Sequence, residues 1–217
     1  HCRVWLLDTF GTAAPMASSL SLHDRILAEN IPSSHDFLAT ILEAMKSNIV
    51  LQITFRSFSM QEAKTFLVEP YCVKMSAQRW YMLARNVDYN YLRLYSLDRI
   101  EDVKLTDAHF VLPKGFCAKE YFAEYFGIVL DESIPLQRIV LRADKYHQHY
   151  MRTLPLHHSQ KEIYACDDYA DFELTLRPTY DFYMKLMSFG NMIKVLEPKS
   201  LQEKICKWLE KTIEVYK

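Results

Sequence analysis

The stretch EPYCVKMSAQRWYMLARN, residues 69–86, decides the fold of this chain because its apolar and aromatic residues alternate with polar ones around a short polar break. Alternation of this kind is typical of half-buried β-strands. The same texture recurs in a set of segments separated by turn-prone residues: 50–58, 65–76, 78–86 and 91–107. The sequence therefore predicts four or five antiparallel strands that form a small barrel.

A helix is predicted in front of these strands, over residues 35–48. Phe37, Ile41 and Met45 recur there at four-residue spacing, and Ser34 is placed to cap the N-terminus of the helix. Residues 1–47 as a whole are interpreted as a helical linker segment.

The C-terminal part of the chain predicts a different architecture, in which strands and helices alternate. The expected order is strand, helix, strand, strand, helix, strand, over residues 136–144, 145–154, 159–166, 171–178, 180–189 and 192–198. This βαββαβ order is that of the split-βαβ, ferredoxin-like arrangement. A closing amphipathic helix is expected over residues 200–217, capped by Ser200, with its apolar side formed by Leu201, Ile205, Trp208, Leu209 and Ile213.

The boundary between the two parts is predicted at a short aromatic helix over residues 119–128, which Gly127 would end. The expected fold class is therefore α+β. The expected domains are a helical segment at 1–47, a β-barrel at 48–127 and a ferredoxin-like domain at 128–217.

Composition limits the function classes. The 217 residues carry a formal net charge of −1 and are 50% hydrophobic, which favours a globular chain and excludes a polycation that bulk charge would draw to nucleic acid. The five cysteines are scattered and form no CxxC pair, so reduced thiols in the cytoplasm are expected. No apolar run is long enough to cross a membrane, and no membrane partner is expected. The first residue is His1, which suggests a fragment of a longer protein.

Catalytic and metal-binding motifs are not predicted, and neither is a cofactor. The 4 glycines are dispersed, whereas phosphate loops and nucleophile elbows need them at fixed positions. His147 and His149 lie two residues apart on an expected helix, so their side chains diverge and cannot bind one ion as an i, i+4 pair would. An enzyme remains the weakest of the functional hypotheses, and no catalytic residue is assigned.

A local excess of basic and aromatic residues is the main functional signal. Between Tyr71 and Arg99 there are five basic residues and two acidic ones, with six aromatic residues interleaved. Period-two geometry places Tyr81 and Arg85 on one face of a strand, and Arg93 and Tyr95 on one face of the next, so that cations and rings are expected to converge. Such a surface suits a nucleotide or a single-stranded nucleic acid. The alternative is that the rings fill the barrel core and the arginines pair with neighbouring carboxylates as a solvated rim.

Two segments of the chain resemble the WYL-domain transcriptional regulators of bacteria. EPYCVKMSAQRWYMLAR is similar to the family's proline-containing strand that leads to its Trp-Tyr-Leu tripeptide, with Met82 in place of the leucine. LRLYSLDRIEDVKLT is similar to the family's second motif, with Tyr95 in place of the usual phenylalanine. The C-terminal part also resembles the extension domain that follows WYL domains, so the resemblance runs from about residue 36 to the C-terminus.

This resemblance implies an Sm-like or SH3-like barrel that binds a nucleotide or single-stranded nucleic acid. Binding would control the contact with DNA that an attached N-terminal helix-turn-helix makes. No recognition helix of that kind is visible in the printed sequence. A cytoplasmic homodimer is expected. The resemblance points to Tyr81, Arg93 and Arg99 as ligand-binding residues, and strand geometry adds Lys74, Arg79, Arg85 and Tyr95. Arg56, toward the end of the first expected strand, is a further expected contact. The alternative function is a protein-interaction or dimerisation module without a small ligand.

Overall fold

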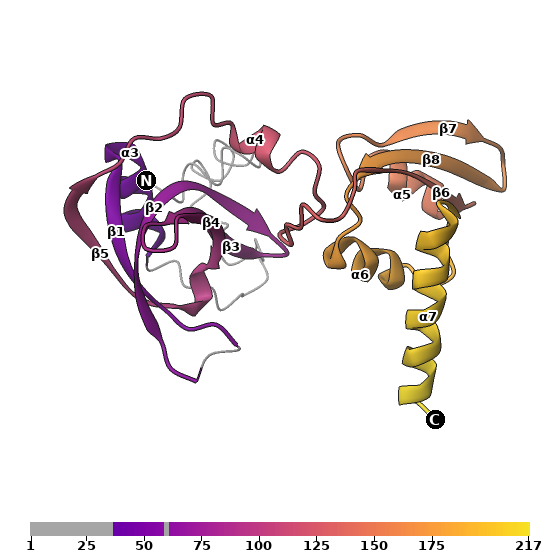
Figure 1. Cartoon of the computed structure of the whole chain (residues 1–217). Coiled ribbons are helices and arrows are strands. Elements are labelled where there is room, and N and C mark those ends of the chain that lie inside the picture. Colours follow the sequence, from indigo (N-terminus) through magenta and orange to yellow (C-terminus); the bar gives the residue numbers. More distant parts are fainter. Residues whose placement is uncertain (1–36, 59–60) are drawn as a thin grey trace, which may run out of the picture. The chain divides into compact units, whose positions relative to one another are not determined.

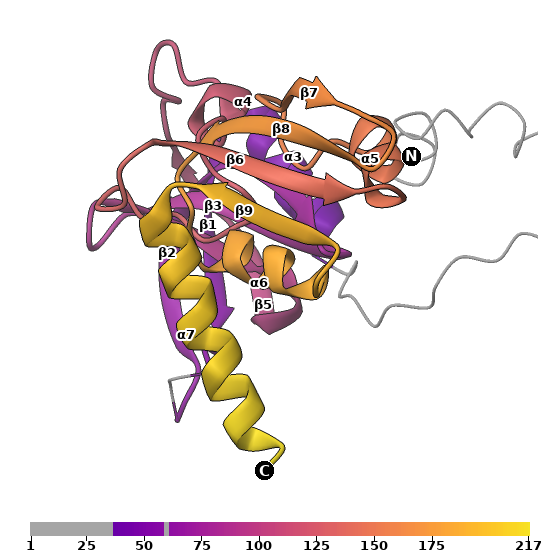
Figure 2. The same ribbon diagram turned by 90° about the vertical axis from the view of Figure 1, so that its right-hand side faces the viewer.

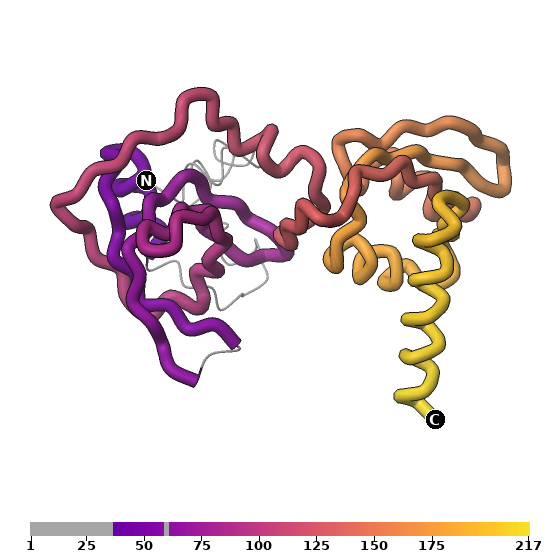
Figure 3. The backbone as a smooth tube through the Cα atoms, viewed as in Figure 1, coloured from indigo at the N-terminus to yellow at the C-terminus, as the bar shows by residue number. Residues whose placement is uncertain are grey.

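The computed structural model describes residues 37–58 and 61–217, and its internal contacts divide the chain into two units between Pro113 and Lys114 (Figure 1). Each unit combines helices with an antiparallel sheet, which confirms the predicted α+β class. The expected helical linker lies outside the described residues up to residue 36, and so does the predicted cap Ser34. The backbone trace of each unit can be followed in Figure 3.

Unit 1 is built on a five-stranded antiparallel sheet with the strand order β4-β3-β2-β1-β5. Its strands are β1 (Ile49–Phe55), β2 (Lys64–Ser76), β3 (Arg79–Asn86), β4 (Tyr91–Ser96) and β5 (Ile100–His109). The 3-10 helix η2 (Leu97–Arg99) joins β4 to β5, the two edge strands.

The long β2–β3 hairpin contains residues 69–86, whose alternation predicted β-strands. Ser76 pairs with Arg79, so the connecting loop is only Ala77 and Gln78. Both loop residues have positive φ, 44° and 65°, as a type I′ turn requires. That turn matches the right-handed twist of the two strands and holds their register.

Helix α3 (Leu38–Ser47) covers the core of unit 1. Ile41 is fully buried, and Phe37 and Met45 pack against the same core, so the predicted apolar side is confirmed. Burying a side chain of this size contributes roughly 1.5–3 kcal/mol. No side-chain hydrogen bond caps the first turn, and the helix ends at Asn48, which adopts the left-handed conformation.

Unit 2 has the predicted βαββαβ order followed by a helix. Its elements are α4 (Ala118–Tyr121), β6 (Gln137–Asp144), α5 (His147–Thr153), β7 (Lys161–Ala165), β8 (Tyr169–Leu176), α6 (Tyr180–Ser188), β9 (Ile193–Glu197) and α7 (Lys199–Val215). Figure 2 shows the four strands side by side in the order β7-β8-β6-β9, all antiparallel. Alternate residues of β6 and β8 pack with α5 and α6 to form the core.

Two helices of unit 2 differ from the expectation. Helix α7 begins after Pro198 without a side-chain cap bond, so Ser200 lies inside the helix and does not cap it. Its apolar side is only partly covered, because Leu201 is buried whereas Leu209 and Ile213 are 42% and 55% exposed. The helix expected over residues 119–128 is reduced to the four residues of α4.

The segment around Gly127 is anchored to α6. Asp181 Oδ2 accepts hydrogen bonds from the backbone N–H groups of Ile128 and Val129, at 2.7 and 2.9 Å. Gly127 has a φ of 79°, and a Cβ atom there would lie 2.3 Å from the same carboxylate oxygen. Glycine is required here for both backbone conformation and space.

Candidate functional site

The register of β3 and β4 divides the predicted binding residues between two faces of the sheet. Met82 pairs with Tyr95 and Ala84 with Arg93, so Arg93 and Tyr95 lie on the face that carries the core. Tyr81 and Arg85 are the alternate residues of β3 and therefore lie on the opposite face. The expectation that all these cations and rings converge is wrong for this geometric reason.

Arg85 is committed to a partly buried ion pair. Its Nε donates to Glu69 Oε2 at 2.7 Å, its Nη2 donates to Oε1, and its Nη1 donates to Asn90 Oδ1 at 2.7 Å. Glu69 is buried, and hydrogen bonding to this carboxylate raises the pKa of Arg85. The guanidinium therefore links β3 to β2. If Arg85 bound a ligand instead, the Glu69 carboxylate would remain buried without its partner, which is costly.

Two other predicted arginines also have carboxylate partners. Arg79 Nη1 lies 3.2 Å from Asp98 Oδ2, and Arg56 Nε lies 2.7 Å from Glu101 Oε1. Both pairs are solvent-exposed, so they contribute little to stability, but each places a carboxylate that neutralises the guanidinium. Lys74 pairs with Tyr81 across β2 and β3, on the face away from the core.

Arg93 and Arg99 come together at a single aromatic ring. Each guanidinium carbon lies 5.6 Å from the centroid of the Phe55 ring, and Arg99 also lies 4.7 Å from the Phe58 ring. Over residues 37–58 and 61–217, neither arginine has a carboxylate within ion-pair distance. We call Phe55, Phe58, Arg93 and Arg99 the arginine–phenylalanine site.

The 3-10 helix η2 makes this convergence possible. Strand alternation along β4 stops at Ser96, where the Ser96 hydroxyl donates to Asp98 and Leu97 turns into the core. The turn carries Arg99 beside β1, where the N–H of Arg56 donates to the Arg99 carbonyl at 3.0 Å. Arg99 Nε is buried and has no hydrogen-bond partner within the described part of the chain.

Tyr95 supports the site from inside the core and offers no free face to a ligand. It is fully buried, its hydroxyl accepts from Asn86 Nδ2 at 3.1 Å, and its ring meets Phe55 edge-on at 5.2 Å. Burial raises the pKa of the Tyr95 phenol, which keeps this hydroxyl neutral. Arg93 lies 5.5 Å above the same ring, so Tyr95 positions that guanidinium.

An open pocket of about 340 Å³ adjoins Arg99 and includes Phe58, which is 85% exposed. Its other lining residues are Arg56, Ser57, Asp98 and Glu101. An exposed ring beside a guanidinium is a surface on which a nucleobase can stack. Phe55 and Phe58 were missed in the sequence because they lie about 40 residues before the arginines and no spacing rule connects them.

No cluster of three metal-ligating side chains occurs where the structure describes the chain, and His147 is instead bonded to Asp144 at 3.1 Å. Among the same residues, no helix is both long and apolar enough to cross a bilayer.

Comparison with known families gives two matches. Residues 36–105 match the WYL domain, and residues 135–213 match the WCX domain. No curated protein matches the sequence.

Two solved structures are similar at low sequence identity. Proteasome accessory factor B/C (PafBC) of Arthrobacter aurescens is 20% identical with a TM-score of 0.39, and the match covers 79% of this chain and 26% of that one. A CRISPR Cas-related protein is 13% identical with a TM-score of 0.47, covering 83% of this chain and 52% of that one. The chain therefore spans about a quarter and about half of these two structures.

Proposed function

Since the chain belongs to the WYL-domain proteins, with a WCX domain after the WYL domain, we propose that it is the ligand-sensing part of a bacterial transcriptional regulator. In this proposal the arginine–phenylalanine site binds a nucleotide or single-stranded nucleic acid. Binding controls an attached N-terminal helix-turn-helix that contacts DNA. The protein acts in the cytoplasm by binding and not by catalysis.

The observation that carries the proposal is the pair of arginines without carboxylate partners among the described residues. Arg93 and Arg99 each lie 5.6 Å from the centroid of the Phe55 ring, and among the described residues neither has a carboxylate partner of the kind that neutralises Arg56, Arg79 and Arg85. Guanidinium groups bind phosphate oxygens through two parallel hydrogen bonds. In a bound strand, each of the two arginines would pair with a phosphate of its own, and the two phosphates would compensate both charges.

The exposed ring of Phe58 favours a ligand that carries a base. Stacking of a base on an aromatic side chain is worth about 1–3 kcal/mol in single-strand binders. A phosphate bound by Arg99 would place the attached sugar and base beside Phe58, since the guanidinium and this ring are 4.7 Å apart. The proposed ligand therefore has both a phosphate and a flat ring.

The test measures binding of a labelled thymidine oligonucleotide and of mononucleotides to the 217-residue chain by fluorescence anisotropy. We expect the double variant Arg93→Gln/Arg99→Gln to lose binding by at least about a hundredfold, since each charge-assisted contact contributes roughly 1.5–3 kcal/mol. Lys104→Gln, which removes an exposed charge paired with Asp102, is the matched control and should bind as wild type. Equal affinities for the double variant and wild type would refute the site.

A second candidate function is a dimerisation module, in which the protein binds another copy of itself. The observation in its favour is the exposed apolar side of α7, where Leu209 and Ile213 are 42% and 55% exposed. Sedimentation equilibrium of wild type and of Leu209→Glu/Ile213→Glu tests it. A dimer that dissociates in the variant supports this function, and a monomeric wild type excludes it.

A further inference from the structure

We propose that the WCX domain has a ligand site of its own, a groove between α5 and α6 that binds a small aromatic carboxylate. We call it the helical groove, and its principal lining residues are Phe126, His147, Tyr150, Leu154, Lys185 and Phe189. This inference does not depend on the arginine–phenylalanine site, because every lining residue belongs to unit 2.

The helical groove has the size and surface of a small-molecule site. Its volume is about 530 Å³, within the range of roughly 300–1,000 Å³ that is typical of ligand pockets. His147 and Tyr150 lie one turn apart on α5, and Leu154 follows the helix directly. Tyr150 and Leu154 are 68% and 77% exposed. An apolar surface that stays open to solvent beside a cavity indicates a binding site.

Aromatic rings give the helical groove flat walls. The His147 ring meets Phe189 edge-on with a centroid distance of 6.4 Å, and it lies 5.6 Å from the Tyr150 ring. Phe126 meets the buried Phe182 edge-on at 5.6 Å, which anchors it against α6. A flat ring system can lie between such walls with the offset or edge-on geometry that aromatic pairs prefer.

The charges of the helical groove select an anion. No lining residue is acidic, and the two ionisable basic side chains are His147 and Lys185. Asp144 already bonds His147 at 3.1 Å. Lys185 Nζ lies 4.7 Å from the Phe189 ring centroid and has no carboxylate partner among the residues that the structure describes. A carboxylate attached to the ring system would pair with this ammonium.

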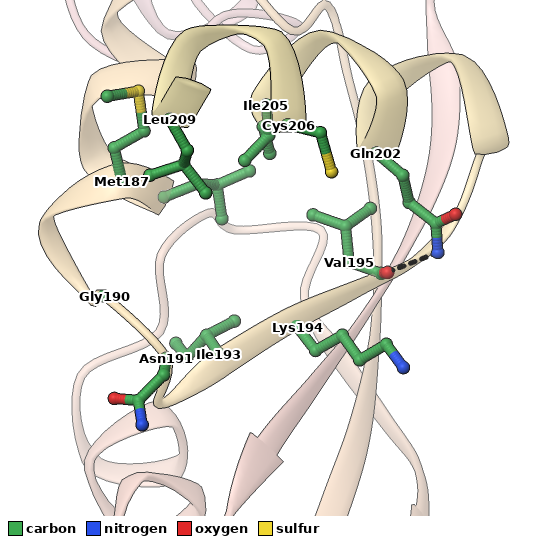
Figure 4. Close-up of a pocket in the computed structure, with 11 residues that line it drawn as sticks. Met187, Gly190, Asn191, Ile193, Lys194, Val195, Gln202, Ile205, Cys206 and Leu209 are labelled. Carbon is green, nitrogen blue, oxygen red and sulfur yellow. Dashed lines mark hydrogen bonds between the residues drawn. The ribbon is translucent and has the colours of Figure 1, made fainter. Parts of the chain in front are cut away.

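A second apolar groove in the same domain provides an internal control. It has a volume of about 500 Å³ and lies between α6, β9 and α7 (Figure 4). Its lysine, Lys194, extends away from Met187 and Leu209 in Figure 4. The Gln202 amide there already donates to the carbonyls of Val195 and Leu196, at 2.6 and 3.1 Å. Among the residues that line the groove of Figure 4, the basic side chain is therefore Lys194, which points away from the apolar side chains of α6 and α7.

The experiment titrates 2-naphthoate and its neutral isostere 2-naphthamide into the 217-residue chain by calorimetry. We expect wild type to bind 2-naphthoate about tenfold more tightly than the amide, as one charge-assisted contact implies. Lys185→Met should remove this preference and leave amide binding unchanged. Lys194→Met, the matched change in the groove of Figure 4, should behave as wild type.

A further variant locates the site without touching the core. Leu154→Glu adds a negative charge at the exposed edge of the helical groove and should weaken 2-naphthoate binding at least about tenfold, with circular dichroism confirming the fold. The proposal is overturned by the absence of saturable binding, by equal affinities for acid and amide, or by a loss in Lys194→Met that equals the loss in Lys185→Met.

Discussion

Removing each arginine of the arginine–phenylalanine site should reduce the salt dependence of nucleic-acid binding by the contribution of one phosphate contact. Each phosphate contact to a single strand contributes a slope of about −0.7 to the logarithm of the affinity against the logarithm of salt concentration. Arg93 and Arg99 lack carboxylate partners among the described residues, and Arg79 and Arg85 have them. Two contacts therefore predict a slope of about −1.4 for wild type.

This slope sets the expected numbers. Raising the salt concentration from about 50 to about 200 mM should weaken wild type about sevenfold and either single variant, Arg93→Gln or Arg99→Gln, about threefold. The double variant should show almost no salt dependence. The assay is fluorescence anisotropy with a labelled thymidine oligonucleotide at four salt concentrations.

The control separates this site from general surface charge. Arg79→Gln removes the same charge from β3, but that guanidinium is already paired with Asp98. We expect its slope to match that of wild type. If the slope of Arg79→Gln falls as much as that of Arg93→Gln, the binding charge is spread over both faces of the sheet and the reasoning from unpaired guanidinium groups is wrong.

Other predictions concern stability and thiol chemistry. In urea unfolding, Gly127→Ala should lower the free energy of unfolding by about 3 kcal/mol, because positive φ alone costs about 1–2 kcal/mol and the new Cβ meets a carboxylate. Gly115→Ala, where φ is also positive but nothing lies within 4 Å, should lower it by only about 1 kcal/mol. Equal losses in the two variants would contradict the steric argument. Arg85→Gln should destabilise the protein by about 2 kcal/mol, less than the 3–5 kcal/mol of a fully buried pair because its side chain is 36% exposed; a neutral result would show that the pair is not structural. Burial raises the pKa of Cys72 to about 11, so at pH 8 this thiol should react with maleimide far more slowly than the exposed thiol of Cys117. Mass spectrometry of the digested protein measures the two rates, and equal rates would contradict the burial of Cys72.

Much of the fold was predictable because local signals determine it. The βαββαβ order of unit 2 follows from changes in hydrophobic period, and four strand segments of unit 1 follow from alternation and short polar breaks. The last of these segments, residues 91–107, is divided by η2 into β4 and β5. Helix ends were less predictable. Ser200 has the residue type of a cap, but Pro198 has a fixed φ suited to the start of α7, and the helix begins before the serine.

The binding site was less predictable than the fold because it depends on which residues lie opposite one another. A single step in register moves a side chain to the other face of a sheet, and a sequence does not state the register. The alternation from Arg93 to Tyr95 was predictable, but it could not reveal that η2 interrupts the strand and carries Arg99 to the ring of Phe55. Composition counted five basic residues in one segment, and it could not tell which of them have carboxylate partners. The pairing of charges, which only the tertiary structure shows, is therefore what distinguishes Arg93 and Arg99 from Arg79 and Arg85 as ligand-binding candidates.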